Sequence, residues 1–153
     1  MKYFIQMLFL LVLMPGYALA FNDLTALLNE KRPVGVVIEI TSGDPLYLKK
    51  IMPELEGDIR KLQKKFSKLP VAIVSHARES LILSNEGSTK HKGLHRQIKN
   101  LSDNTNTTVH VCGTYASWFD ISDSEFPDYI NVSPAGPVQV DDYTDLGYVH
   151  IEL

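Results

Sequence analysis

The sequence has little of what defines several large protein classes. Only one cysteine occurs among 153 residues, which excludes a disulfide framework within the chain and any zinc or iron–sulfur site built on several cysteines. Positive charge is not in excess, because 15 Lys and Arg stand against 18 Asp and Glu, for a net charge of −3. The sequence therefore does not indicate a strongly basic nucleic-acid-binding protein.

Several sequence motifs are missing as well. No Walker A loop and no G-x-G-x-x-G pattern occurs, so no motif supports nucleotide binding, and the G-x-S-x-G motif of α/β-hydrolases is absent. The nine Gly and eight Pro are spread along the chain, which excludes collagen-like and low-complexity classes. With 44% hydrophobic and 22% charged residues, the composition is that of one globular domain.

The first twenty residues have the three parts of a secretory signal. Lys2 precedes an apolar run over 7–14, Pro15 and Gly16 follow, and Ala18-Leu19-Ala20 offers small residues to a signal peptidase. The stretch 3–14 is shorter than the roughly 20 apolar residues of a spanning helix. We therefore predict a signal peptide at 1–20, a single mature domain at 21–153 without a membrane span, and a periplasmic or secreted location.

Five apolar, β-branched segments predict the strands of the mature domain. They cover residues 34–40, 71–75, 108–112, 129–132 and 148–151. The first two are nearly continuous apolar runs, which is typical of parallel strands covered on both faces.

Helical patterns separate these strands. Between the first two strands, apolar residues recur at intervals of three and four from Leu48 to Phe66, and Pro53 either begins the regular helix or kinks a longer one. Leu94, Ile98 and Leu101 define another helical face, preceded by a short helical stretch at 77–83 and a break at 85–88. A single turn at 115–119 and a capping box at 122–125 come after the third strand. This order predicts a three-layer α/β/α sandwich with one mainly parallel five-stranded sheet.

Small and polar residues follow the predicted strands, where ligands of open α/β sheets bind. We predict ligand-binding roles for four of them: Thr41, Ser42, His76 and Ser133. Cys112 ends the third strand, just before a helix start that we expect Thr114 to cap. Backbone N–H groups at such a start favour a thiolate, which makes Cys112 the candidate catalytic residue. The alternative is a small buried hydrophobe, which free cysteine very often is.

The remaining histidines and aromatics have simpler interpretations. His91 and His95 are four residues apart, but the spacing places no third ligand nearby, so no metal site is predicted. His110 and His150 alternate with apolar residues inside strands and are expected to pack there. Trp118, with Tyr115 and Phe119, forms an aromatic cluster that is core packing, a pocket wall or a subunit contact.

Five segments resemble the DsrE/DsrF-like family in the same order along the chain. They are 38–45, 74–83, 109–114 with Cys112, 130–136, and 146–151. The resemblance implies a three-layer α/β/α fold and a tendency to form homo- or hetero-oligomers. Some relatives carry sulfur as a cysteine persulfide, a role that would fall on Cys112 here.

These observations leave three functional hypotheses open. The first is an exported DsrE/DsrF-like protein that handles sulfur or thiols through Cys112, and the sequence does not decide whether it is an enzyme. The second is a non-catalytic envelope protein that binds a small ligand or a partner subunit, and the third is a mainly structural subunit. The expected partners are a second copy or related subunit and a small sulfur species or other small ligand. We predict no cofactor and no nucleic acid.

Overall fold

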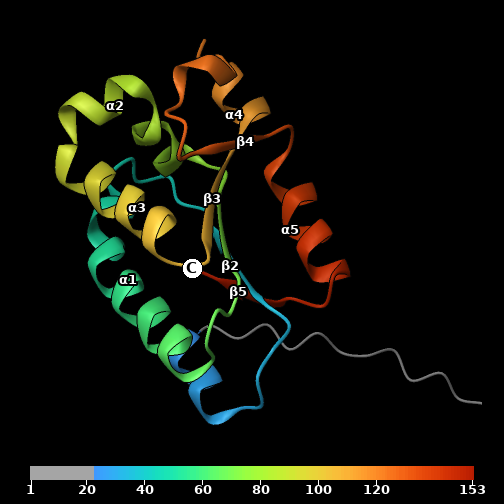
Figure 1. The fold of residues 1–153 in the computed structure, drawn as a ribbon. Helices are drawn as coiled ribbons and strands as arrows, with labels where there is room; N and C mark the ends of the chain where they lie inside the picture. The colour runs from blue at the N-terminus through green and yellow to red at the C-terminus, as the bar shows by residue number, and fades with distance from the viewer. Residues whose placement is uncertain (1–22) are drawn as a thin grey trace, which may run out of the picture.

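A parallel β-sheet forms the centre of the molecule (Figure 1). The computed structural model describes residues 23–153, so the predicted signal peptide lies outside the described residues. The strands are β1 (Val36–Ile40), β2 (Val71–Ser75), β3 (Thr107–Cys112), β4 (Asn131–Ser133) and β5 (Val149–Glu152). They lie in the order β4-β3-β2-β1-β5, and every neighbouring pair is parallel. The predicted sheet is confirmed.

Helices cover both faces of this sheet, as predicted (Figure 1). On one side lie α1 (Tyr47–Lys65), α2 (Asn85–Lys90) and α3 (Lys92–Asn104), and on the other lies α5 (Gly136–Asp145). Shorter elements complete the chain: η1 (Leu24–Asn29), η2 (Arg78–Leu83), α4 (Gly113–Ser117) and η3 (Asp123–Glu125). None of the helices described is both long and apolar enough to cross a membrane.

The strand residues divide between the two faces because side chains alternate along a strand. The face toward α1 and α3, which we call the core face, carries Ile38, Ile73 and Val109 within one large apolar cluster. The opposite face, which we call the α5 face, has a small apolar cluster of Val37, Ala72, Val74 and Val140. Most of the buried apolar side chains therefore lie on the core face.

Two local expectations need correction or refinement. The predicted break at 85–88 is wrong, because α2 begins at Asn85, where the Ser84 hydroxyl accepts the Gly87 N–H at 3.2 Å and caps the helix. Pro53 lies inside α1, which begins six residues earlier at Tyr47. The predicted capping box at Ser122 and Glu125 is confirmed.

Candidate functional site

The carboxyl ends of the parallel strands meet at one edge of the sheet. β1 leads into Thr41, β2 into His76, and β3 and β4 end at Cys112 and Ser133. Cys112 pairs with Ser133 in the register, and Ser75 pairs with Val111, so His76 follows at the position beside Cys112. His76 and Cys112 therefore occupy neighbouring positions on the α5 face.

Cys112 is buried, with 5% of the residue exposed, and it caps α4. Its Sγ accepts the backbone N–H of Tyr115 at 3.3 Å. The cap expected from Thr114 is therefore provided by the cysteine itself. The Thr114 hydroxyl instead donates to the carbonyl of Pro134 at 2.6 Å and links α4 to the loop before α5. The sulfur thus points to the backbone amide groups at the start of α4.

A carboxylate between two imidazoles lies on the same face. Glu39 Oε1 is 2.6 Å from His76 Nε2, and Glu39 Oε2 is 2.7 Å from His150 Nε2. The first contact is a hydrogen bond. Nε2 of His150 has no hydrogen-bond partner among residues 23–153, so the second contact is a close approach without a hydrogen bond. Because a carboxylate only accepts, Nε2 of His76 is the donor in this hydrogen bond.

The start of α5 covers His76 directly. A Cβ added to Gly136 would lie 2.2 Å from Cβ of His76, so only glycine permits this approach. The side chains of His76 and Glu39 nevertheless remain 13% and 16% exposed, and that of His150 remains 27% exposed. The Glu39–His76–His150 cluster is therefore partly accessible to solvent.

The other predicted ligand-binding residues have different surroundings. Thr41 is exposed. The Ser42 N–H donates to Glu79 Oε2 at 2.8 Å, and its hydroxyl accepts the N–H of Asp44 at 3.1 Å. Ser133 is buried and donates to Gln139 Oε1 at 2.8 Å. His76 and Ser133 thus lie on the α5 face, whereas Ser42 is held in the loop after β1.

Glu79 was not identified from the sequence, although it organises this edge. The residue is fully buried and accepts three hydrogen bonds, from the Ser75 hydroxyl at 2.8 Å and from the N–H groups of Ser42 and Ala77 at 2.8 and 3.1 Å. Buried carboxylates are tolerated when donors surround them in this way. Glu79 thereby joins the loop after β1 to the loop after β2. Its position four residues beyond Ser75, within a short polar stretch, gave no pattern that singled it out.

His110 and His95 are packed inside the protein. His110 lies within 3.2 Å of Ser133 Oγ and Thr108 Oγ1 and within 3.0 Å of the Tyr143 hydroxyl, and burial lowers its pKa. His95 contacts the Tyr129 hydroxyl at 2.7 Å and the Ile82 carbonyl at 2.8 Å, and burial lowers its pKa too. With both nitrogens engaged, His95 is not free to share a metal with His91. Within residues 23–153, no group of three or more His, Cys, Asp or Glu is arranged to hold a metal ion.

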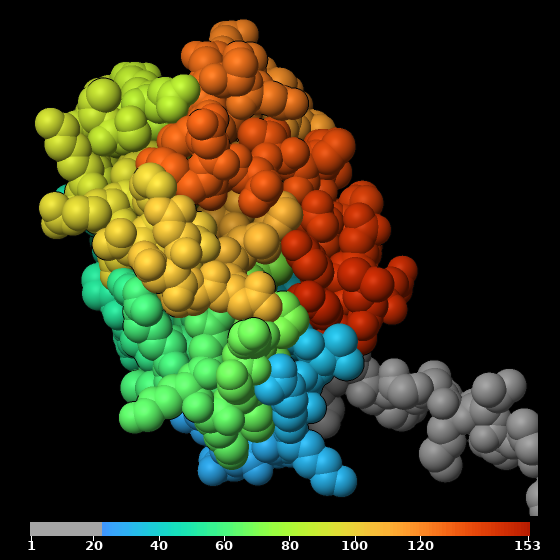
Figure 2. Space-filling view, in the orientation of Figure 1, coloured from blue at the N-terminus to red at the C-terminus, as the bar shows by residue number. Residues whose placement is uncertain are grey.

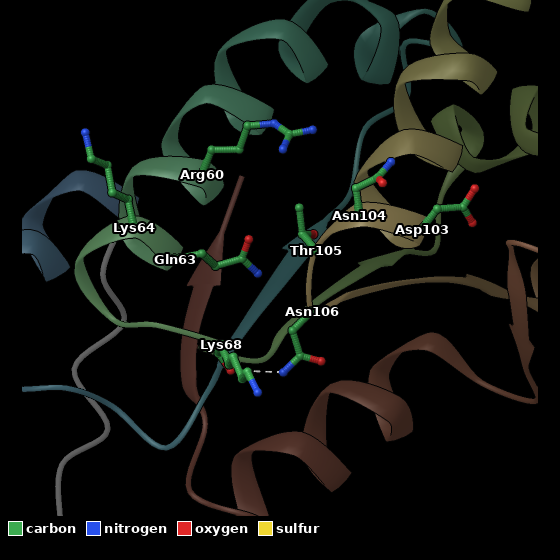
Figure 3. A pocket seen from close by; sticks show the side chains of 8 residues that line it. All are labelled: Arg60, Gln63, Lys64, Lys68, Asp103, Asn104, Thr105 and Asn106. Carbon is green, nitrogen blue, oxygen red and sulfur yellow. Dashed lines mark hydrogen bonds between the residues drawn. The ribbon is translucent and has the colours of Figure 1, made fainter.

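A cavity of about 590 Å³ lies at the opposite edge of the sheet, where β2 and β3 begin (Figure 3). Side chains from the end of α1, among them Arg60 and Lys64, lie across it from Asp103 and Asn104 at the end of α3. Two of its charged groups have protein partners: Arg60 pairs with Glu56, and Asp103 pairs with Lys99. Lysines at the end of α1 also offset the partial negative charge of the helix terminus. This cavity is therefore separate from the carboxyl-edge site.

The molecule is therefore a three-layer α/β/α protein. The side chains of its candidate site lie at the carboxyl edge of a parallel sheet. A solved structure, that of the protein of unknown function MTH1491 from Methanobacterium thermoautotrophicum, is similar, with a TM-score of 0.62. The match covers 77% of this chain and 97% of that one at 14% sequence identity, so it supports the fold alone. No family model matches the sequence, and no curated protein matches it.

Proposed function

We propose that this is an exported DsrE/DsrF-like protein that handles sulfur or thiols through Cys112. The observation that carries the proposal is the hydrogen bond from the Tyr115 N–H to Cys112 Sγ at 3.3 Å, which directs the sulfur to the start of α4. The His76–Glu39 pair adds an imidazole at the strand position next to Cys112 on the same face. The resemblance of five sequence segments to that family supports the same assignment.

The reaction at Cys112 is a sulfur exchange with a hydropersulfide or polysulfide. The Cys112 thiolate attacks the outer sulfur of the donor, a new S–S bond forms at Cys112, and the S–S bond of the donor breaks. The electron pair of the broken bond leaves with the donor as its thiolate, so no other oxidant or reductant takes part. Since only 5% of Cys112 is exposed, we expect small inorganic donors to react faster than bulky ones.

Intact-mass measurement tests this proposal. Folded protein is incubated with inorganic polysulfide and compared with the Cys112→Ser variant. We expect the wild-type mass to rise by one or more sulfur atoms, with the increase removed by dithiothreitol, and the variant mass to stay constant. An unchanged wild-type mass would contradict sulfur handling at Cys112.

Export is the second part of the proposal and rests on residues 1–20. The apolar run before Ala18-Leu19-Ala20 supports a cleavable signal with Phe21 as the mature N-terminus. N-terminal sequencing of protein isolated from the native cells tests it. A protein that retains Met1 or Lys2 would contradict export by cleavage.

A non-catalytic envelope protein that binds a small ligand is the second candidate. The observation that favours it is the partly exposed Glu39–His76–His150 cluster, beside which Thr41 and Ser133 provide further polar groups. Thermal unfolding with thiosulfate or sulfite as the probe separates the two candidates. Stabilisation that persists in Cys112→Ser and disappears in His76→Gln supports binding without sulfur exchange.

A further inference from the structure

The cavity where β2 and β3 begin, which we call the amino-edge cavity, lies between the ends of two helices. Figure 2 shows the green residues at the end of α1 directly beside the yellow residues at the end of α3. Its volume of about 590 Å³ is within the range of ordinary ligand pockets, roughly 300–1,000 Å³. All eight residues that line it are polar or charged (Figure 3). The amino-edge cavity therefore suits a hydrophilic ligand and not an apolar or aromatic one.

The charges around this cavity do not balance. Arg60 and Asp103 are each paired with a residue of their own helix. Lys64 and Lys68 also line the cavity, and neither takes part in an ion pair among residues 23–153. The carboxyl ends of α1 and α3 each contribute about half a negative elementary charge. Because the two lysines exceed this sum, the cavity favours an anionic ligand.

Three side-chain amides of the lining provide hydrogen-bond acceptors. The nitrogens of Gln63, Asn104 and Asn106 donate to backbone carbonyl groups at 3.1, 3.1 and 3.0 Å, which sets the orientation of each amide. Their side-chain oxygens accept no hydrogen bond within residues 23–153. Such oxygens bind hydroxyl groups, whereas they repel the oxygens of a phosphate or sulfate ion. The amides therefore favour a ligand that carries hydroxyl groups.

Lys68 is held at the cavity by an unusual backbone conformation. Its φ of 58° lies in the left-handed region, which residues other than glycine adopt rarely. The Asn106 side chain donates to the Lys68 carbonyl at 3.0 Å and links the turn after α1 to the turn before β3 (Figure 3). Glycine would adopt this conformation with less strain. Lys68 is therefore a position where a positive charge of the cavity can be removed without loss of stability.

We propose that the amino-edge cavity binds an acidic saccharide, whose carboxylates meet the two lysines and whose hydroxyl groups meet the amide oxygens. A neutral saccharide would leave Lys64 and Lys68 without counter-charge, and phosphate would place its oxygens against those of the amides. A free sugar acid and a segment of an acidic polysaccharide share this chemistry. The inference goes beyond the function proposed above and does not depend on Cys112, which lies at the other edge of the sheet.

An NMR titration of the ¹⁵N-labelled domain at 21–153 tests the inference, with digalacturonate, galacturonate, maltose and inorganic phosphate as the probes. At low ionic strength, we expect digalacturonate to shift the side-chain amide signals of Gln63, Asn104 and Asn106 saturably. Maltose and phosphate should bind at least about tenfold more weakly. Tighter binding of digalacturonate than of galacturonate supports a polysaccharide segment, and equal binding supports a free sugar acid. The absence of a saturable shift at these amides, or equal affinity for phosphate or maltose, would overturn the proposal.

Lysine variants with a matched control locate the binding site. Lys64→Ala and Lys68→Gly should each weaken digalacturonate binding about fivefold, the contribution of one exposed ion pair. Lys68→Gly should not lower the melting temperature, because glycine fits the left-handed backbone. Lys49→Ala is the control, since Lys49 is an exposed lysine of α1 that does not line the cavity, and its variant should bind normally. Equal losses in Lys49→Ala and Lys64→Ala would overturn the assignment to the cavity. Cys112→Ser should bind digalacturonate as the wild type does, so a failure of sulfur exchange leaves this result unchanged.

Discussion

The two faces of the sheet are both covered by helices, yet they carry different kinds of residues. The core face presents aliphatic side chains such as Ile38 and Ile73 to α1 and α3. The α5 face has four buried apolar residues and, beside them, Glu39, His76 and Cys112. Burial of apolar area stabilises the fold, whereas ionisable groups cost free energy when they are buried. The comparison indicates that the core face contributes most of the apolar burial, whereas the α5 face carries the groups on which the proposed function rests.

The largest effect should come from a cavity in the core face. Ile38 is completely buried in the large apolar cluster. We expect Ile38→Ala to lower the free energy of unfolding by about 2–5 kcal/mol and Ile38→Val by about 1 kcal/mol. Urea unfolding measures both. A loss below that of the valine variant would show that the core face does not dominate stability.

The second largest loss of stability should come from Glu79, because its carboxylate joins the loop after β1 to the loop after β2. Glu79→Ala removes the acceptor of three hydrogen bonds, and we expect a loss of about 2–3 kcal/mol. Glu79→Gln keeps one carbonyl oxygen and should lose less. Equal losses in the two variants would argue that the carboxylate oxygens do not bind these donors in solution.

Gly136 tests the cover of the α5 face. Its added Cβ would lie 2.2 Å from Cβ of His76, so Gly136→Ala must displace α5 and should cost about 1–3 kcal/mol. Gly93→Ala is the control, because nothing lies within 4 Å of a Cβ at this position of α3. Alanine there should be neutral or slightly stabilising, as helix propensity requires. Identical stabilities of the two variants would contradict the close approach of α5 to His76.

The smallest of these effects is the pH dependence due to His110. Burial lowers the pKa of His110, so the unfolded chain takes up its proton near pH 6.5 while the folded protein does not. Between these two pKa values the unfolded state binds more protons, and stability falls as the pH falls. In His110→Gln, we expect a smaller loss of stability between about pH 7.5 and about pH 5. His95, whose pKa burial also lowers, should keep part of the dependence in this variant.

The sequence predicted the sheet better than the site, for physical reasons. The continuous apolar segments that became β1 and β2 reflect burial on both faces, which is a strong local signal. The fourth strand was predicted at 129–132, whereas β4 covers Asn131–Ser133. Tyr129 lies in the preceding loop, where its hydroxyl contacts His95. The few residues of β4 leave little periodicity to read.

The site depends on contacts between residues far apart in the chain. Glu39 and His76 are 37 residues apart, and His150 lies on a third strand, so no local pattern joins them. Their association follows from the order of β2, β1 and β5 in the sheet, which short sequence patterns do not determine. The Thr114 cap was wrong for a related reason, since the partner that Thr114 uses, Pro134, comes from the next strand connection.

Alkylation of Cys112 tests the central claim most directly, namely that the α5 face carries the reactive group. The rate with iodoacetamide is followed by intact mass in folded protein, in protein unfolded by urea, and in Cys112→Ser as the blank. Because Sγ faces the N–H of Tyr115, we expect the folded protein to react at neutral pH, and more slowly when the cluster is disrupted by Glu39→Gln. Reaction only after unfolding would identify Cys112 as a core residue and contradict the account.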